Sequence, residues 1–352
     1  MDGEVSSTSK RRPEYPFSAI VGQDEMKEAL ILNVVDPSIG GVLIRGEKGT
    51  AKSTAVRGLA ELLPPHHVVA DCQFHCDWNN PEAFCPYCQE KATQGMVLKK
   101  DSVSMKVVEL PLSATEDRVA GTLDIEHALA TGKKKFEPGI LAEANGNLLY
   151  VDEVNLLDDH IVDILLDSSA MGVNFVEREG VSFVHPARFT LVGTMNPEEG
   201  DLRPQLLDRF GLAVDVRGET DPSRRVQVIK NRMSYEADPY SFRAIFDEQQ
   251  EVLRQRILNA QSIIHDIRVT PEVLNAAVEL SLHLKVDGHR ADITLVKSAV
   301  AWAAFNDRKE VSIKDLVNVA KLVLTHRMRR LPFEEAKLDI GEMETWLQNH
   351  VI

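Results

Sequence analysis

The chain has 352 residues, a net charge of −14 at pH 7 and a sequence pI of about 5.3. An apolar fraction of 43% and a charged fraction of 27% suit a globular protein, and the length suits two domains. The acidic balance argues against nucleic-acid binding, and no apolar run approaches the ~18 residues of a membrane span. We expect a cytoplasmic protein with a disordered tail over residues 1–14, because the polar start lacks a signal core.

Five apolar runs alternate with helical patterns after this tail. They are expected to be buried strands and cover residues 41–45, 106–111, 147–152, 189–194 and 212–216. Such alternation predicts an α/β fold with a five-stranded parallel sheet that has helices on both faces. An alternating stretch at 174–184 predicts a β-hairpin inserted before the fourth run.

The strand signal ends near residue 220, and only helical patterns follow. They cover residues 222–234, 240–265, 271–285, 289–305, 313–327 and 333–348. We therefore expect a core over 15–220, linker helices over 221–265 and an all-α domain over 266–352.

A glycine-rich stretch joins the first expected strand to a helix. It consists of Gly46, Glu47, Lys48, Gly49, Thr50, Ala51, Lys52 and Ser53. The backbone N–H groups of such a turn, together with the helix N-terminus, can surround phosphate oxygens. Lys52 is placed to reach the β- and γ-phosphates, and the Ser53 hydroxyl to ligate Mg²⁺. Ala51 stands where the usual pattern has glycine, so the match is imperfect.

Polar residues follow the later strands. Asp152 and Glu153 end the third run, where Asp152 can hold the Mg²⁺ of a nucleotide and Glu153 can polarise the attacking water. Asn196 ends the fourth run and could orient the same water. Arg209 follows on a helical turn and could be an arginine finger, which reaches the γ-phosphate bound by a neighbouring subunit. The alternative for Arg209 is a salt bridge to Asp208 or another nearby acid.

All the cysteines of the chain lie in an insertion at residues 66–104. They are Cys72, Cys76, Cys85 and Cys88. Two close pairs suit tetrahedral thiolate ligation, with zinc as the first choice; a [4Fe–4S] cluster fits the same ligand set. A metal bound by these cysteines would stabilise the folded structure of a polar loop. Alternatively, the cysteines could act as a redox sensor. Reduced thiols or redox disulfides are the alternatives, and the nearby histidines are interpreted as surface residues.

The phosphate loop, acidic strand end, polar sensor and trailing arginine, in this order, resemble the AAA+ ATPases. Over residues 14–335, outside the cysteine insertion, the chain resembles the subunit I family of magnesium chelatases. The most specific segments are residues 112–119, 136–139, 160–163, 176–178 and 196–211.

This resemblance implies a P-loop core with a helical lid, and Arg290 as a second sensor. It implies ATP hydrolysis with Mg²⁺ at the interfaces of a homo-oligomeric ring, usually a hexamer. The expected partners are an AAA+ D subunit with an integrin-like domain and a large porphyrin-binding H-type subunit. The motor would drive insertion of magnesium, or in related systems cobalt, into a tetrapyrrole. Alternatives are a MoxR-type remodelling chaperone, a helicase-like DNA-binding ring and an inactive nucleotide-binding scaffold.

Overall fold

The computed structural model describes residues 12–123, 136–178, 181–328 and 340–350. Most of the expected tail, the turn of the hairpin at 179–180 and the start of the last expected helix lie outside these ranges. The end of the expected tail is attached to the body of the protein. Tyr235 Oη donates to the Pro13 carbonyl at 2.7 Å, and the Glu14 amide donates to Glu61 at 2.7 Å.

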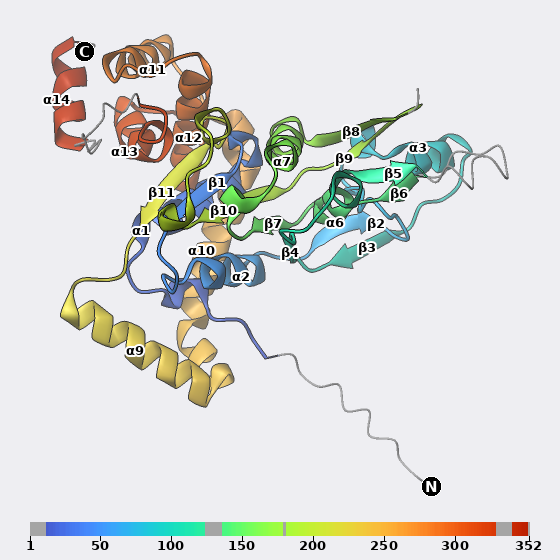
Figure 1. The fold of residues 1–352 in the computed structure, drawn as a ribbon, viewed down its shortest axis with the longest axis horizontal. Helices are drawn as coiled ribbons and strands as arrows, with labels where there is room; N and C mark the ends of the chain where they lie inside the picture. The colour runs from blue at the N-terminus through green and yellow to red at the C-terminus, as the bar shows by residue number, and fades with distance from the viewer. Residues whose placement is uncertain (1–11, 124–135, 179–180, 329–339, 351–352) are drawn as a thin grey trace, which may run out of the picture.

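A five-stranded parallel sheet forms the centre of the core, in the order β11-β1-β10-β7-β4 (Figure 1). Its strands are β1 (Val42–Gly46), β4 (Val107–Glu109), β7 (Leu148–Val151), β10 (Thr190–Met195) and β11 (Leu212–Val216). The predicted sheet is confirmed, although β4 is shorter than the apolar run that predicted it.

Successive residues of β1 face opposite sides of the sheet, as the pleat requires. Val42 and Ile44 belong to a core that includes residues of α1 and α2, whereas Leu43 belongs to a second core with residues of α7. Both faces of the sheet carry an apolar core, because its strands are buried on both sides.

The helices of the core are α1 (Asp24–Val35), α2 (Lys52–Leu62), α4 (Glu116–Ala120), α6 (Ile140–Ala144), α7 (Asp159–Met171) and α8 (Pro204–Leu207). Short 3-10 turns are η1 (Phe17–Ala19), η2 (Pro37–Ile39), η3 (Pro81–Ala83), η4 (Val154–Leu156), η5 (Pro197–Glu199) and η6 (Ile264–Asp266).

Three two-stranded antiparallel sheets and α3 (Pro86–Thr93) gather at one end of the molecule (Figure 1). The pairs are β2 (His66–Val69) with β3 (Lys100–Val103), β5 (Gly121–Leu123) with β6 (Phe136–Pro138), and β8 (Val173–Arg178) with β9 (Val181–Pro186). The last pair confirms the predicted hairpin. Together with α3 these sheets surround a third apolar core, which contains the cysteines.

Helices alone make up the described chain after β11. They are α9 (Pro222–Ala237), α10 (Pro239–Ile263), α11 (Pro271–His283), α12 (Arg290–Phe305), α13 (Ile313–Leu324) and α14 (Ile340–His350). Helix α9 projects from the core, while α11 to α14 form a bundle at the end opposite the small sheets (Figure 1). Within the described ranges no helix combines the length and the apolar character needed to cross a bilayer.

Candidate active site

The glycine-rich loop between β1 and α2 depends on left-handed backbone. Gly46 has a φ of 156°, and a Cβ there would lie 2.1 Å from the Val216 carbonyl oxygen, so only glycine fits. Gly49 and Ala51 have φ values of 83° and 64°. Ala51 thus adopts the backbone that the usual glycine would take, at a cost of about 1–2 kcal/mol for an L-residue. The departure from the pattern therefore leaves the loop conformation intact.

Lys52 begins α2, and its ammonium is directed back at the loop. Its Nζ donates to the Gly46 carbonyl at 2.5 Å and to the Glu47 carbonyl at 3.2 Å. Partial burial lowers the pKa of Lys52, while nearby carboxylates, Asp152 foremost, oppose that shift. A partly desolvated ammonium beside the amides at a helix N-terminus can bind an anion, as the loop sequence predicts.

The Asp152 carboxylate is oriented by two hydroxyl groups. Thr194 Oγ1 donates to Asp152 Oδ1 at 2.5 Å, and Tyr150 Oη donates to the same oxygen at 3.1 Å. Burial raises the pKa of Tyr150, so its hydroxyl stays protonated as a donor. Both donors lie on neighbouring strands β7 and β10, which explains why the carboxylate has a defined direction at the sheet edge.

Glu153 follows with a φ of 54°, and its amide donates to Thr194 Oγ1 at 3.3 Å. Its carboxylate pairs with Lys48 at 3.1 Å, and Lys48 also pairs with Glu199 at 2.8 Å. This ammonium lowers the pKa of Glu199. Lys48 therefore links the phosphate loop to the acidic strand end, in addition to its predicted place in the loop.

Asn196 is buried at the end of β10, and its Oδ1 accepts from the Glu198 amide at 3.3 Å. Residues 47–53 of the loop line one cleft of about 1190 Å³ together with Asp152, Glu153 and Asn196, whereas Gly46 does not line it. The structure thus brings together most residues predicted for the site. The remaining lining residues are Tyr15, Ile20, Val21, Gln23, Thr54, Tyr150, Thr194, Met195, Arg217, Gly218, Glu219, Thr220, Arg225, Val228 and Arg232.

Two of the predicted catalytic residues, Arg209 and Arg290, do not line this cleft. Arg209 forms ion pairs with Asp163 and Asp167 of α7, so within one chain the salt-bridge alternative holds. These two carboxylates are the other nearby acids that the alternative allowed, whereas Asp208 pairs with Arg290 at 2.7 Å. The two arginines therefore lie near one another, at a place separate from their own chain's cleft.

The sequence did not predict three further residues of the site. Thr194 and Tyr150 contact Asp152, and Glu199 shares Lys48 with Glu153. Thr194 and Tyr150 each lie two residues before a predicted site residue, so strand alternation could have placed them on the same face. The sequence also did not predict Arg225 and Arg232 of α9, which line the cleft with one face of that helix. No motif marks these arginines, because the position of α9 depends on tertiary packing.

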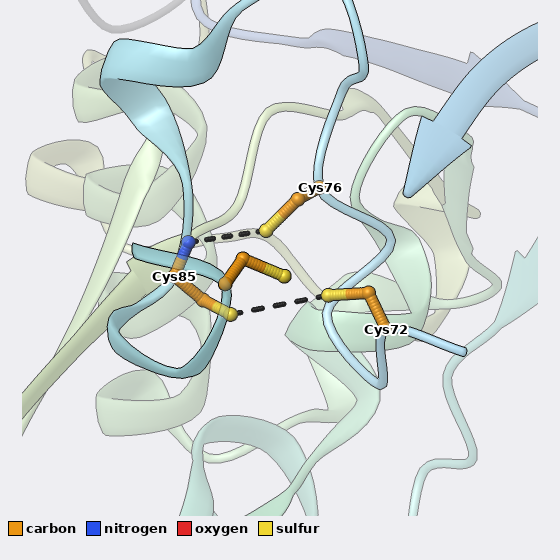
Figure 2. A group of neighbouring side chains, drawn as sticks. Cys72, Cys76 and Cys85 are labelled. Atoms are coloured by element: carbon orange, nitrogen blue, oxygen red, sulfur yellow. Dashed lines mark hydrogen bonds between the residues drawn. The ribbon is translucent and has the colours of Figure 1, made fainter. Parts of the chain in front are cut away.

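The four cysteines form a second candidate site in the small-sheet end of the molecule. Their sulfur atoms all lie within 4.8 Å of one another, and three of the residues are buried (Figure 2). The spacing pattern predicted that these residues meet, and the structure brings them together in space.

The sheet order, the phosphate loop and the acidic edge of β7 define a P-loop ATPase of the AAA+ class. Family models agree: "AAA lid domain" matches residues 274–345, and "Magnesium chelatase, subunit ChlI" matches residues 122–202. A putative ATPase from Cytophaga hutchinsonii, 18% identical with a TM-score of 0.59, covers 94% of this chain and 91% of its own and shares the fold.

Magnesium-chelatase subunits are among the relatives of this chain. A ChlI homolog of Methanocaldococcus jannaschii is 55% identical over 94% of this chain and 90% of its own length. ChlI of Cyanophora paradoxa is 50% identical over 95% and 96%. A chain from the cryo-EM-based complex between the magnesium-chelatase subunits BchI and BchD is 45% identical, with a TM-score of 0.54 over 94% of this chain and 99% of its own. This chain belongs to the magnesium-chelatase ChlI subunit family and is an AAA+ ATPase.

Proposed function

We propose that this chain is the ring-forming motor whose ATP hydrolysis drives insertion of a metal ion into a tetrapyrrole held by a separate subunit. Magnesium is the first candidate for the inserted metal and cobalt the second. Support comes from the high identity to ChlI subunits along nearly the whole chain. A motor is chemically reasonable, because Mg²⁺ loses its water ligands reluctantly.

The residues of the cleft suit MgATP. Backbone amides of the loop and Lys52 would hold the phosphates, and Ser53 and Asp152 would hold the Mg²⁺. Glu153 would accept a proton from the attacking water, which Asn196 would orient. The oriented Asp152 carboxylate and the desolvated Lys52 fit these roles, since both are positioned by contacts within the chain.

The single observation that carries the ring proposal is the separation of Arg209 and Arg290 from their own cleft. Transfer of a γ-phosphoryl group needs a cation to stabilise its charge, and a neighbouring copy could supply Arg209. We therefore propose shared sites in a homo-oligomeric ring, as a hexamer. The BchI–BchD complex suggests a D-type partner for this chain as well, and an H-type subunit would hold the tetrapyrrole. We also propose that the protein is located in the cytoplasm. We further propose that the four cysteines bind a metal.

Mixing experiments test the shared site. Steady-state ATPase should rise cooperatively with protein concentration and fall steeply in Arg209→Ala and in Glu153→Gln. A mixture of the two variants should regain activity, because some interfaces then pair an intact Glu153 with an intact Arg209. Turnover that is independent of concentration and survives Arg209→Ala would overturn the ring mechanism.

Reconstitution tests the chelatase assignment. The chain should support ATP-dependent metal insertion, followed by porphyrin fluorescence, when D-type and H-type subunits are present with Mg²⁺ or Co²⁺. Glu153→Gln is the matched control, because it keeps the phosphate loop and loses the base. ATPase activity without metal insertion under any of these conditions would favour a remodelling chaperone.

A further inference from the structure

The cysteine sulfurs form a compact tetrad that draws on two segments of the insertion. Cys72 and Cys76 lie on the loop after β2, and Cys85 and Cys88 lie at the start of α3. The Cys72 and Cys85 sulfurs are 3.9 Å apart, and no pair exceeds 4.8 Å (Figure 2). Thiols gain little from such clustering in an apolar core, whereas thiolates around a cation gain strong bonds.

These sulfur–sulfur distances distinguish between zinc and a [4Fe–4S] cluster, both of which are compatible with the sequence. A tetrahedral zinc ion with bonds of about 2.3 Å places its sulfur ligands about 3.8 Å apart. In a cubane cluster each thiolate binds a different iron, so the cysteine sulfurs stand on the order of 6 Å apart. The observed tetrad matches the single ion and is too small for a cubane.

The backbone around the tetrad has features of a thiolate site. The Cys85 amide donates to the Cys76 sulfur at 3.1 Å, a bond that stabilises negative charge on that sulfur (Figure 2). His75, a residue of the same loop, directs Nδ1 at the Ala142 carbonyl at 3.3 Å. Within the described residues the tetrad contains cysteines alone, so the histidines are not needed as ligands.

The loop that carries Cys72 and Cys76 is also the centre of the third apolar core. Phe74 lies between these two cysteines. Its ring packs in a tilted arrangement against Phe183 of β9 and Phe136 of β6, with centroid distances of 5.6 Å and 6.0 Å. Asn145, just before β7, donates to the carbonyls of Phe74 and His75 at 2.9 and 3.0 Å. The loop therefore connects the strand pairs β5–β6 and β8–β9 to the central sheet.

We propose that Cys72, Cys76, Cys85 and Cys88 bind one Zn²⁺ ion, and that this ion folds the loop against which the strand pairs β5–β6 and β8–β9 pack. The four zinc–sulfur bonds would add to the packing of Phe74 and to the hydrogen bonds of Asn145, which connect this loop to its neighbours. The site lies at the opposite end of the core from the lid, and its role is structural.

Metal analysis of the full-length protein, purified without added metal, tests the stoichiometry. We expect one zinc per chain, released as a mercurial reagent titrates the four thiols. Exchange into Co²⁺ should give the intense visible bands of a tetrahedral tetrathiolate. Iron with acid-labile sulfide, or protein that contains no metal and takes up no Co²⁺, would overturn the proposal.

Variants test the ligands and the structural role. Cys88→Ser should lose the zinc, whereas His67→Ala, a neighbouring change outside the tetrad, should keep it. Hydrogen exchange on the wild-type protein after zinc removal should increase at residues 136–138 and 173–178, while β1 stays protected. Unchanged exchange in both strand pairs, β5–β6 and β8–β9, would refute the structural role. Because metal content is measured separately from ATP turnover, the outcome does not depend on the proposed motor function.

Discussion

Arg327, just after α13 in the helical lid, donates to the backbone carbonyl of Asp208, the residue before the candidate finger Arg209, at 3.0 Å. The same guanidinium donates to the carbonyls of Gly211 at 3.0 Å and Phe210 at 2.5 Å. Burial lowers the pKa of Arg327 to about 10, with the Asp208 carboxylate opposing that shift. The lid therefore holds the backbone on both sides of Arg209.

Arg327→Ala should lower the free energy of unfolding by about 3 kcal/mol, because several buried carbonyls lose a charged donor. ATPase activity should fall as the backbone around Arg209 loses its position. Urea denaturation and steady-state turnover measure the two effects. Arg268→Ala is the control, since its exposed pair with Glu310 should contribute below about 1 kcal/mol. Equal losses in both variants would contradict the role of Arg327.

Arg290 should act on the neighbouring subunit's site, together with Arg209. Its guanidinium is bonded to Asp208 at 2.7 Å and does not line its own cleft. Arg290→Ala mixed with Glu153→Gln should therefore regain ATPase activity. A mixture of Arg290→Ala with Arg209→Ala should stay inactive, because each interface then lacks one of the two arginines.

The reverse pattern would contradict this arrangement. If Arg290 served its own chain's site, Arg290→Ala would recover with Arg209→Ala and fail with Glu153→Gln. Steady-state turnover at fixed total protein and varied mixing ratio distinguishes the two cases.

Thr194→Val should lower kcat/KM for MgATP roughly tenfold or more, since it removes a hydrogen bond to a charged carboxylate. Thr194 Oγ1 is the group that contacts both Asp152 Oδ1 and the Glu153 amide. Valine keeps the shape of threonine, so stability should change little by comparison. Thr194→Ser keeps the hydroxyl and should retain most activity; an equal loss in serine and valine variants would point to packing instead.

Ala51→Gly should change the free energy of unfolding by less than about 1 kcal/mol. Relief of left-handed strain is offset by the greater entropy of glycine in the unfolded chain. Ala51→Val should cost about 2 kcal/mol or more and weaken MgATP binding, because a branched side chain is poorly tolerated at a φ of 64°. Denaturation midpoints and nucleotide titration check both. Similar stability for valine and glycine would show that the left-handed turn is not required.

Local pattern was enough to predict the parallel sheet, the phosphate loop and the acidic end of β7. Hydrophobic periodicity and glycine placement act within a few residues, so these features are visible without a structure. The cysteine spacing similarly predicted a four-sulfur site, because both close pairs lie in one short segment.

Contacts between distant segments were decided by the tertiary structure alone. The choice of Asp163 and Asp167 as partners of Arg209, and the bond of Arg327 to the carbonyl of Asp208, join residues 42 or more positions apart. The size of the sulfur tetrad, which distinguishes one metal ion from a cluster, also depends on how the loop after β2 approaches the start of α3. Sequence pattern encodes which residues are buried along an element, whereas these distances follow from how whole elements pack against one another.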